Sequence, residues 1–407
     1  RDGARGGRGC NGGRRGLRRT LALVGVTALL LAACGGGGSS TPAPSPPPPP
    51  PPPPTPVSGP AWFGYGRDAQ HTAVSAIASR LLGRGLPVFT GYFAEGDAFS
   101  ELPWAQAAAA HSKSPHHIVC PRAEDFASQF RSITYHLDEP AAGPGAFPQF
   151  VVSALARQHV KVVLGGQGGD EVFGGYARYL LMYLEESLKG AIFGSQDPQR
   201  HIVTLGRVLP NLGMLEEYVP LLKEFWSKGV FDAPQHRYYS LVARYSALAP
   251  ALTRDFREQR NDGAILAAFE AQFNDILSHV SSGGSALLNR MTAYDLRTGL
   301  QALLHVEDRM SMAWGLESRL PLLDHRIVEL AFRMPPLFKY RDGKAKSALL
   351  SAVKNMIPDA VGDRRDKKGF PVPFVDWAQG PLRGMVGDIL LGARARQRGL
   401  FDAEGVE

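Results

Sequence analysis

The segment 162–176 constrains the fold of this chain more than any other part of the sequence. It begins with an apolar run (162–164), continues through a glycine-rich stretch (165–169) and then reaches Asp170. A short apolar run is typical of a buried parallel strand, and glycines after it let backbone N–H groups approach an anion closely. Asp170 stands where a carboxylate would hold a divalent cation against phosphate oxygens. The segment therefore predicts nucleotide binding. The alternative is a tight strand-to-helix turn with solvated acidic side chains.

Strand-like and helix-like patterns alternate on both sides of this segment, which predicts an α/β fold with a parallel sheet covered on both faces. Ligands bind at the carboxyl ends of such strands, so the turns at Gly91 and at 165–170 are expected on one edge. From Arg178 onward the apolar spacing predicts a second, α-rich region. The predicted strands are 86–93, 117–120 and 161–164, and the predicted helices are 73–82, 101–111, 124–136, 150–159, 180–188, 215–226, 239–248 and 265–277.

The first sixty residues have a different character. A basic stretch precedes the apolar run 21–31, which has the length of a signal-peptide core and is too short to span a bilayer securely. Cys34 follows in a sequence that resembles a lipoprotein cleavage and lipidation box. Residues 35–60 are rich in Gly, Ser and Pro and are expected to form a stiff spacer. We interpret 1–34 as a leader and 35–60 as a linker.

Two interpretations of these segments stay open. They form a membrane anchor and stalk through Cys34, or they do not belong with the domain behind them, whose nucleotide-binding pattern is expected of an intracellular enzyme. The leader also explains the basic balance, because its first twenty residues supply six of the seven formal positive charges. The remaining chain is nearly neutral, so we expect no nucleic-acid partner. The three cysteines have neither metal-ligand spacing nor the density of a disulfide framework.

A second charged region lies near the C-terminal end. For Glu317, Arg319 and Asp324 the preferred interpretation is structural ion pairing. Lys346 is different, because a polyphosphate leaving group needs a cation that neutralises developing charge. We place Lys346 on a helix after Gly343 and take it as the candidate for that role, the alternative being a solvated helical lysine.

Several segments, taken together and in order, resemble the synthetase domain of glutamine-hydrolysing asparagine synthetases. The resemblance runs from about Ala73 to the C-terminus. It rests on 116–117, 136–140, 165–176, 308–325, Lys346 with its apolar helix, and 367–373.

The resemblance implies an ATP-pyrophosphatase fold, Rossmann-like, with an α/β nucleotide-binding core at 61–190 and a mostly helical remainder at 191–407. It implies that ATP and Mg²⁺ are cofactors, that the side-chain carboxylate of aspartate attacks the α-phosphorus of ATP, and that ammonia then displaces AMP from β-aspartyl-AMP. The implied catalytic positions are Asp170, which would also coordinate Mg²⁺, Lys346 and Gln167. The implied adenylate contacts are Gly91, Gly165, Gly166 and Gly168.

Three departures from the family pattern set further expectations. The family opens this domain with Ser-Gly-Gly-x-Asp-Ser, whereas this chain has Gly66–Thr72 without the serines, the glycine pair or the aspartate in register. The strand before it is expected to be missing or poorly replaced by 61–65, so we expect impaired adenylation. Position 167 often carries an acid in the family, but an amide such as Gln167 cannot act as a base at neutral pH. Proton removal is therefore unassigned.

The third departure concerns the nitrogen source. We find no glutaminase-like segment in the sequence, so free ammonia is the expected donor, with glutamine-derived ammonia only where a glutaminase is supplied separately. The function expected first is an asparagine-forming carbon–nitrogen ligase. The alternatives are a β-lactam-forming ligase on the same scaffold, which would need a Tyr–Glu pair, and a non-catalytic nucleotide-binding or lipoprotein remnant. The sequence predicts no particular oligomeric state.

Overall fold

The computed structural model describes residues 61–63, 69–139, 143–193, 225–227, 229–230, 232–243, 245–276, 286–341, 344–364 and 371–406. The proposed leader, the linker and residues 215–224 of one predicted helix lie outside the described residues. No helix in the described ranges is both long enough and apolar enough to cross a membrane.

A five-stranded parallel sheet with the order β3-β2-β1-β4-β5 forms the centre of the α/β part. The order reverses direction between β1 and β4, and ligands bind outside the carboxyl ends of strands at such a reversal. The parallel sheet and the α/β class confirm the sequence prediction. The strands are β1 (Ala61–Phe63), β2 (Val88–Gly91), β3 (His116–Val119), β4 (Val162–Leu164) and β5 (Glu317–Arg319).

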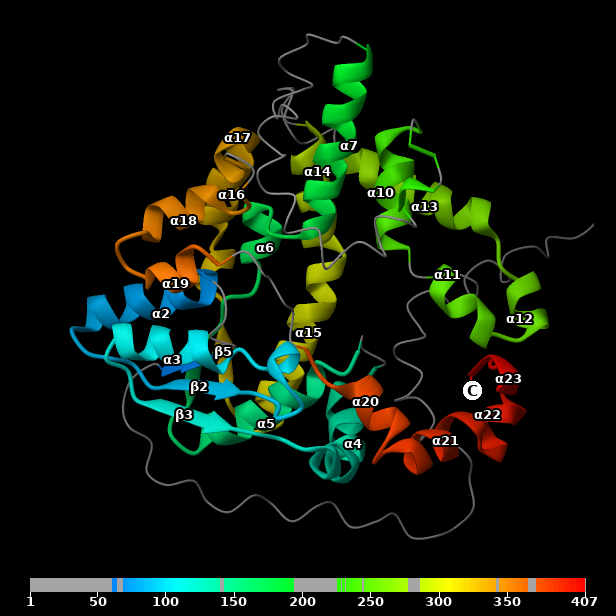
Figure 1. Cartoon of the computed structure of the whole chain (residues 1–407), viewed down its shortest axis with the longest axis horizontal. Helices are drawn as coiled ribbons and strands as arrows, with labels where there is room; N and C mark the ends of the chain where they lie inside the picture. The colour runs from blue at the N-terminus through cyan, green and yellow to red at the C-terminus, as the bar shows by residue number, and fades with distance from the viewer. Residues whose placement is uncertain are drawn as a thin grey trace, which may run out of the picture.

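Helices cover both faces of the sheet (Figure 1). Successive side chains of a strand point to opposite faces, so neighbouring apolar residues bury against different helices. Phe89 and Val163 pack with α5 (Ala146–Arg157) on one face. Val88 packs on the other face with α2 (Ala69–Leu82) and α3 (Leu102–His111). This two-sided burial explains why the central strand β4 is continuously apolar in sequence.

One expectation about strands was wrong, and one strand was not predicted. We expected the first strand to be missing or poorly replaced, but Ala61–Phe63 pairs with both β2 and β4 at the centre of the sheet. Residues 317–319, for which we predicted ion pairing and no strand, form the edge strand β5, which continues the sheet beyond β4. Because β5 follows the helical region in the chain, the sheet is completed by residues far from its other four strands.

The helix α4 (Ala123–Leu137) shows why these predicted helices form. Its buried residues Phe126, Phe130, Ile133 and Leu137 recur at helical spacing and face α5 and α15 (Gly299–Met312). The Asp125 carboxylate accepts a hydrogen bond from the Arg122 backbone N–H at 2.9 Å, which satisfies a donor at the start of the helix.

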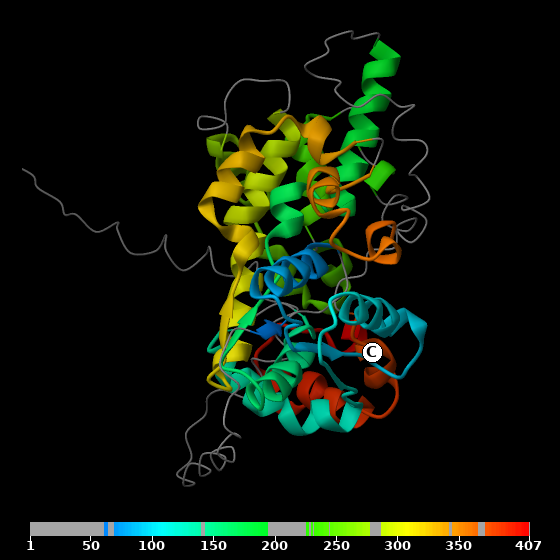
Figure 2. The ribbon, with the colours of Figure 1, turned by 90° about the vertical axis from the view of Figure 1, so that its left-hand side faces the viewer.

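The α-rich region also agrees with the sequence prediction. The helices α7 (Ala177–Phe193), α10 (Pro234–Val242), α13 (Asp262–Asp275) and α14 (Ala286–Arg297) enclose one buried, aromatic-rich core. Figure 2 shows this region lying to one side of the sheet-containing part. Further short helices are α6 (Gly169–Phe173), α11 (Tyr245–Leu248), α12 (Arg254–Glu258), α16 (His325–Arg333), α17 (Pro336–Lys339), α18 (Ser347–Val353), α19 (Asp359–Gly362), α20 (Phe374–Gln379), α21 (Arg383–Leu391), α22 (Ala393–Gln397) and α23 (Ala403–Val406).

Candidate active site

The turn after β4, residues 165–168, lies at the carboxyl edge of the sheet, beside the reversal of strand order, and is called the glycine turn below. The Gly165 N–H donates to the Arg319 carbonyl at 2.8 Å and so extends the pairing with β5. Gly168 has φ 87°, a left-handed conformation that favours glycine. A Cβ there would also collide with the Leu323 side chain. The turn is therefore fixed by backbone geometry and packing before any ligand is considered.

Close packing also requires glycine at positions 165 and 166. A Cβ on Gly165 would lie 2.5 Å from Oε1 of Glu307, and a Cβ on Gly166 would lie 2.6 Å from the His71 ring. The backbone of this turn is thus in contact with a carboxylate from α15 and an imidazole from α2. The predicted adenylate contacts of Gly165, Gly166 and Gly168 stay a prediction.

Asp170 and Lys346 meet next to this turn although they are far apart in the sequence. The Lys346 Nζ lies 3.3 Å from Asp170 Oδ1, and both side chains are about one-tenth exposed. Gly175 makes room for the pair, since a Cβ there would lie 1.8 Å from Asp170 Oδ1 and 3.0 Å from Lys346 Cδ. A buried ion pair of this kind is a preorganised cation and anion with little solvent between them.

The backbone position of Lys346 differs from the prediction. We placed Lys346 on a helix, but it is the residue just before α18, with φ 57°. A non-glycine residue in this region typically costs on the order of 1–3 kcal/mol, and such strain clusters at functional sites. The turn that holds it is closed by Ser347, whose Oγ accepts from the Arg341 N–H at 3.1 Å and donates to the Lys344 carbonyl at 2.6 Å.

Gly91 ends β2, where it is paired with Val119 of β3. It lies on the same edge of the sheet as the glycine turn, because all five strands are parallel, but β1 stands between β2 and β4. The sheet therefore brings Gly91 to the edge that we predicted, with β1 between the strand of Gly91 and the strand before the turn.

Gln167 lies close enough to the side chain of Glu307 to influence its pKa. Glu307 is buried, and its Oε1 accepts a hydrogen bond from the Ser318 hydroxyl at 2.5 Å. Burial raises the pKa of Glu307, although the hydrogen bond from Ser318 and the nearby His71 and Gln167 lower it in part. Glu307 and His71 were not among the site residues predicted from the sequence. The acidic pair at 307–308 was a signal for Glu307, but the helical pattern did not show which of the two acids faces inward.

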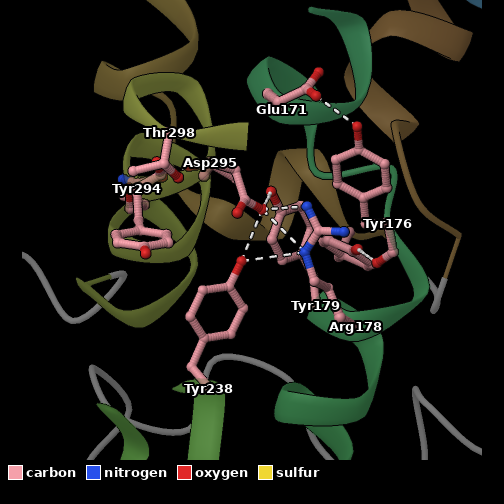
Figure 3. Close-up of polar contacts among 11 residues, drawn as sticks. Glu171, Tyr176, Arg178, Tyr179, Tyr238, Tyr294, Asp295 and Thr298 are labelled. Atoms are coloured by element: carbon pink, nitrogen blue, oxygen red, sulfur yellow. Dashed lines mark hydrogen bonds and ion pairs between the residues drawn. The ribbon is translucent and has the colours of Figure 1, made fainter. Parts of the chain in front are cut away.

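A second polar cluster, which was not predicted from the sequence either, lies among the helices α7, α10 and α14 (Figure 3). The Asp295 carboxylate accepts from Arg178 Nη2 at 2.5 Å and from the Tyr238 hydroxyl at 2.7 Å, and the Tyr179 hydroxyl donates to the same oxygen. These residues tie α7, α10 and α14 together. Removing one partner of a buried charge pair costs about 3–5 kcal/mol, so the cluster positions the helices around the candidate site.

The ion pairs expected at the C-terminal segment are present. Arg319 Nε lies 2.8 Å from Glu317, and Asp324 pairs with Arg326 at 2.9 Å. Both pairs are mostly exposed and have no part in the buried arrangement. Asp324 also accepts from the Arg326 N–H at the start of α16, which gives it a capping role.

The donor set suits a metal that is held mainly by substrate. Among the described residues no group of three His, Cys, Asp or Glu side chains converges on one point. Mg²⁺ is commonly held by one or two carboxylates together with substrate phosphates, so Asp170 alone fits such an ion once phosphates are present. The adjoining Lys346 fits the phosphates themselves.

Comparisons with known proteins show the family to which the chain belongs. The profile of the asparagine synthase family matches residues 72–407. The chain belongs to the asparagine synthase family. A putative glutamine-hydrolysing asparagine synthetase of Mycobacterium tuberculosis is 33% identical over 309 residues, which cover 75% of this chain and 44% of the relative. Glutamine-hydrolysing asparagine synthetase 1 of Bacillus subtilis is 27% identical over 303 residues, covering 73% and 44%.

Other similar proteins carry different names. The amidase chry2 of Gibberella zeae is 23% identical over 339 residues, which cover 80% of this chain and 49% of that protein. The chain thus spans less than half the length of each of these relatives. The family supports a ligase-type enzyme whose members use ATP.

Proposed function

We propose that this chain performs the ATP-dependent half of asparagine synthesis on an ATP-pyrophosphatase, Rossmann-like core. The side-chain carboxylate of aspartate attacks the α-phosphorus of ATP, which gives β-aspartyl-AMP and pyrophosphate. Free ammonia then displaces AMP and forms asparagine. The observation that carries the proposal is the buried Asp170–Lys346 pair beside a glycine turn at the reversal of strand order.

Each residue at the edge has a proposed role. Asp170 would hold Mg²⁺, which when bound neutralises phosphate charge. Lys346 would stabilise the charge that develops on the departing pyrophosphate. The backbone at Gly91 and at the glycine turn (Gly165, Gly166 and Gly168) would contact the adenylate. Exclusion of water by the surrounding buried side chains strengthens these electrostatic interactions.

We further propose that adenylation is slow in this chain, with the 61–190 core and the helical remainder acting together in the cytoplasm. The segment Gly66–Thr72 lacks the side chains that the family uses around pyrophosphate. Residues 64–68 lie outside the described part of the chain, and residues 69–72 begin α2. Replacing 66–71 by Ser-Gly-Gly-x-Asp-Ser should raise aspartate-dependent AMP formation.

The ring-closing alternative is less well supported. The structure contains a Tyr–Glu pair, because the Tyr176 hydroxyl donates to Glu171 at 2.5 Å (Figure 3). Burial and the adjacent Glu171 carboxylate raise the pKa of Tyr176 well above its ordinary value. Ring closure at this pair would therefore need the phenol to pass its proton to Glu171 as it accepts one from the amine, which makes Tyr176 a relay rather than the base itself.

The test of the proposal is aspartate-dependent exchange of labelled pyrophosphate into ATP, titrated with Mg²⁺. Loss of an outer-shell partner already costs about 10–100-fold in metal affinity, so Asp170→Asn should weaken apparent Mg²⁺ affinity at least about tenfold. Asp363→Asn is the matched control, because Asp363 is exposed and pairs with Lys344. Thermal unfolding shows whether the variants fold. Exchange that does not depend on aspartate, or equal Mg²⁺ affinity in both variants, contradicts the proposal.

A further inference from the structure

The proposed roles of Asp170 and Lys346 leave the buried acid Glu307, at this edge of the sheet, without a task. Glu307 projects from α15 and is 4% exposed. Its charged neighbours are His71, from α2, and Asp308, the next residue on its own helix. Ser318 on β5 donates a hydrogen bond to its Oε1, and Gln167 in the glycine turn lies close to it. Residues of the sheet, the turn and two helices therefore surround this carboxylate.

The carboxylate also reaches the place where the proposed intermediate would lie. Oε1 of Glu307 would be only 2.5 Å from a Cβ on Gly165, so it is in contact with the backbone at the start of the turn. That turn is the proposed contact of the adenylate. An acyl group joined to the phosphate of the adenylate would therefore stand beside Glu307.

Amide formation needs a proton acceptor at this point. Ammonia that has attacked the acyl carbon carries a positive charge until it loses a proton. A side-chain amide accepts no proton at neutral pH, which excludes Gln167. We propose that Glu307 accepts the proton of the nitrogen nucleophile in the amide-forming step, held in position by Ser318. This inference rests on the proposed function.

The step balances without a further reactant. The nitrogen lone pair of ammonia forms the C–N bond to the acyl carbon, and one N–H proton passes to the Glu307 carboxylate. The bond between the acyl carbon and the phosphate oxygen breaks, and its electron pair leaves with AMP. Glu307 then returns the proton to solvent. A raised pKa suits this task, because a general base works best when its pKa approaches the working pH.

The experiment separates the amide-forming step from adenylation by supplying synthetic β-aspartyl-adenylate to the full chain and measuring ammonia-dependent asparagine formation. Glu307→Gln keeps the shape of the side chain and its hydrogen-bonding capacity but removes the base. General-base catalysis typically contributes about 10²–10⁴-fold, so we expect this loss in the rate of ammonolysis. Aspartate-dependent pyrophosphate exchange should stay within about twofold of the parent, since adenylation needs no nitrogen nucleophile.

Two variants distinguish catalysis from packing. Asp308→Asn removes the neighbouring carboxylate, which is exposed on the same helix, and should leave ammonolysis unchanged. In the double variant Glu307→Gln with Gln167→Glu a carboxylate stands instead at the neighbouring position 167, and ammonolysis should recover at least about tenfold over the single variant. When rates are expressed per unprotonated ammonia, the parent should show an acidic limb that Glu307→Gln lacks.

The possible outcomes show whether the proposed adenylation step or the proposed role of Glu307 is wrong. If the parent accelerates ammonolysis of supplied adenylate but shows no aspartate-dependent exchange, the proposed activation step is wrong and the role of Glu307 stands. If Glu307→Gln matches the parent in ammonolysis, or loses exchange and ammonolysis equally while still folded, Glu307 is not the proton acceptor. A parent that does not accelerate ammonolysis at all also overturns the inference.

Discussion

Two buried lysines of one short segment, Lys339 and Lys346, are held in opposite ways. Lys346 lies 3.3 Å from the Asp170 carboxylate. Lys339 is completely buried, and the partners that the structure shows for it are the side-chain oxygen of Asn289 at 3.1 Å and the face of the Phe332 ring. Burial lowers the pKa of Lys339 from 10.5 to about 7.

The difference shows what burial does to a cation with and without a counter-charge. A lysine that is taken out of water without a carboxylate relieves the cost by losing its proton. A lysine beside a carboxylate has an opposite charge that favours the protonated form. Of the two, Lys346 is therefore the one suited to meet the negative charge of a phosphate, and Lys339 is suited to a packing role.

The largest effect is expected for Lys346→Met. Removing one preorganised group that stabilises transition-state charge typically costs about 10²–10³-fold in rate, or about 2.7–4 kcal/mol. We expect a loss of this size in pyrophosphate exchange at saturating Mg²⁺. Lys339→Met is the matched control, since it removes an equally buried lysine from the same segment. Equal losses in the two variants would mean that the counter-charge of Lys346 has no functional meaning.

The next effect concerns stability rather than rate, and its sign follows from the lowered pKa of Lys339. Between pH 7 and 10.5 the unfolded chain holds a proton on this lysine that the folded chain lacks, so stability rises with pH across this window. At about 1.4 kcal/mol per pKa unit, the gain between pH 6 and pH 9 is roughly 2–3 kcal/mol. This gain should disappear in Lys339→Met.

Chemical denaturation of the parent and Lys339→Met at pH 6 and pH 9 measures this pH-dependent gain in the free energy of unfolding. Near pH 6 the methionine variant should be the more stable protein, because the folded parent then buries a charge. A parent whose stability falls from pH 6 to pH 9, with the variant falling in parallel, would show that Lys339 does not titrate in this window.

The sequence predicted Asp170 and Lys346 because both stand in local patterns that carry chemistry. An apolar strand followed by glycines and an acid indicates a ligand edge by itself. The ion pair between Asp170 and Lys346 depends on Gly175, whose lack of a Cβ leaves space for the two side chains. No local pattern reports that space, and none reports that Lys346 precedes α18 in a left-handed conformation.

Strands β5 and β1 were difficult to predict from the sequence for physical reasons. β5 consists of Glu317, Ser318 and Arg319, which are polar because this strand forms an edge of the sheet with two exposed side chains. β1 is only three residues long and follows a proline-rich segment. Glu307 was missed because a polar residue on a helix faces solvent in most proteins, and only the packing of α15 against the sheet turns it inward.

The smallest effect is expected for Lys344, which completes the comparison. Lys344 has a carboxylate partner as Lys346 does, but its Nζ lies 3.7 Å from Asp363 and both side chains are at least half exposed. Water already solvates these charges, and exposed pairs typically contribute about 0–1 kcal/mol. Lys344→Met should therefore change the free energy of unfolding by less than about 0.5 kcal/mol and leave pyrophosphate exchange within about twofold. Urea unfolding and the exchange assay, run beside Lys346→Met, measure both quantities. If Lys344→Met lost exchange as severely as Lys346→Met, the charge of the segment as a whole would matter rather than the buried position of one lysine.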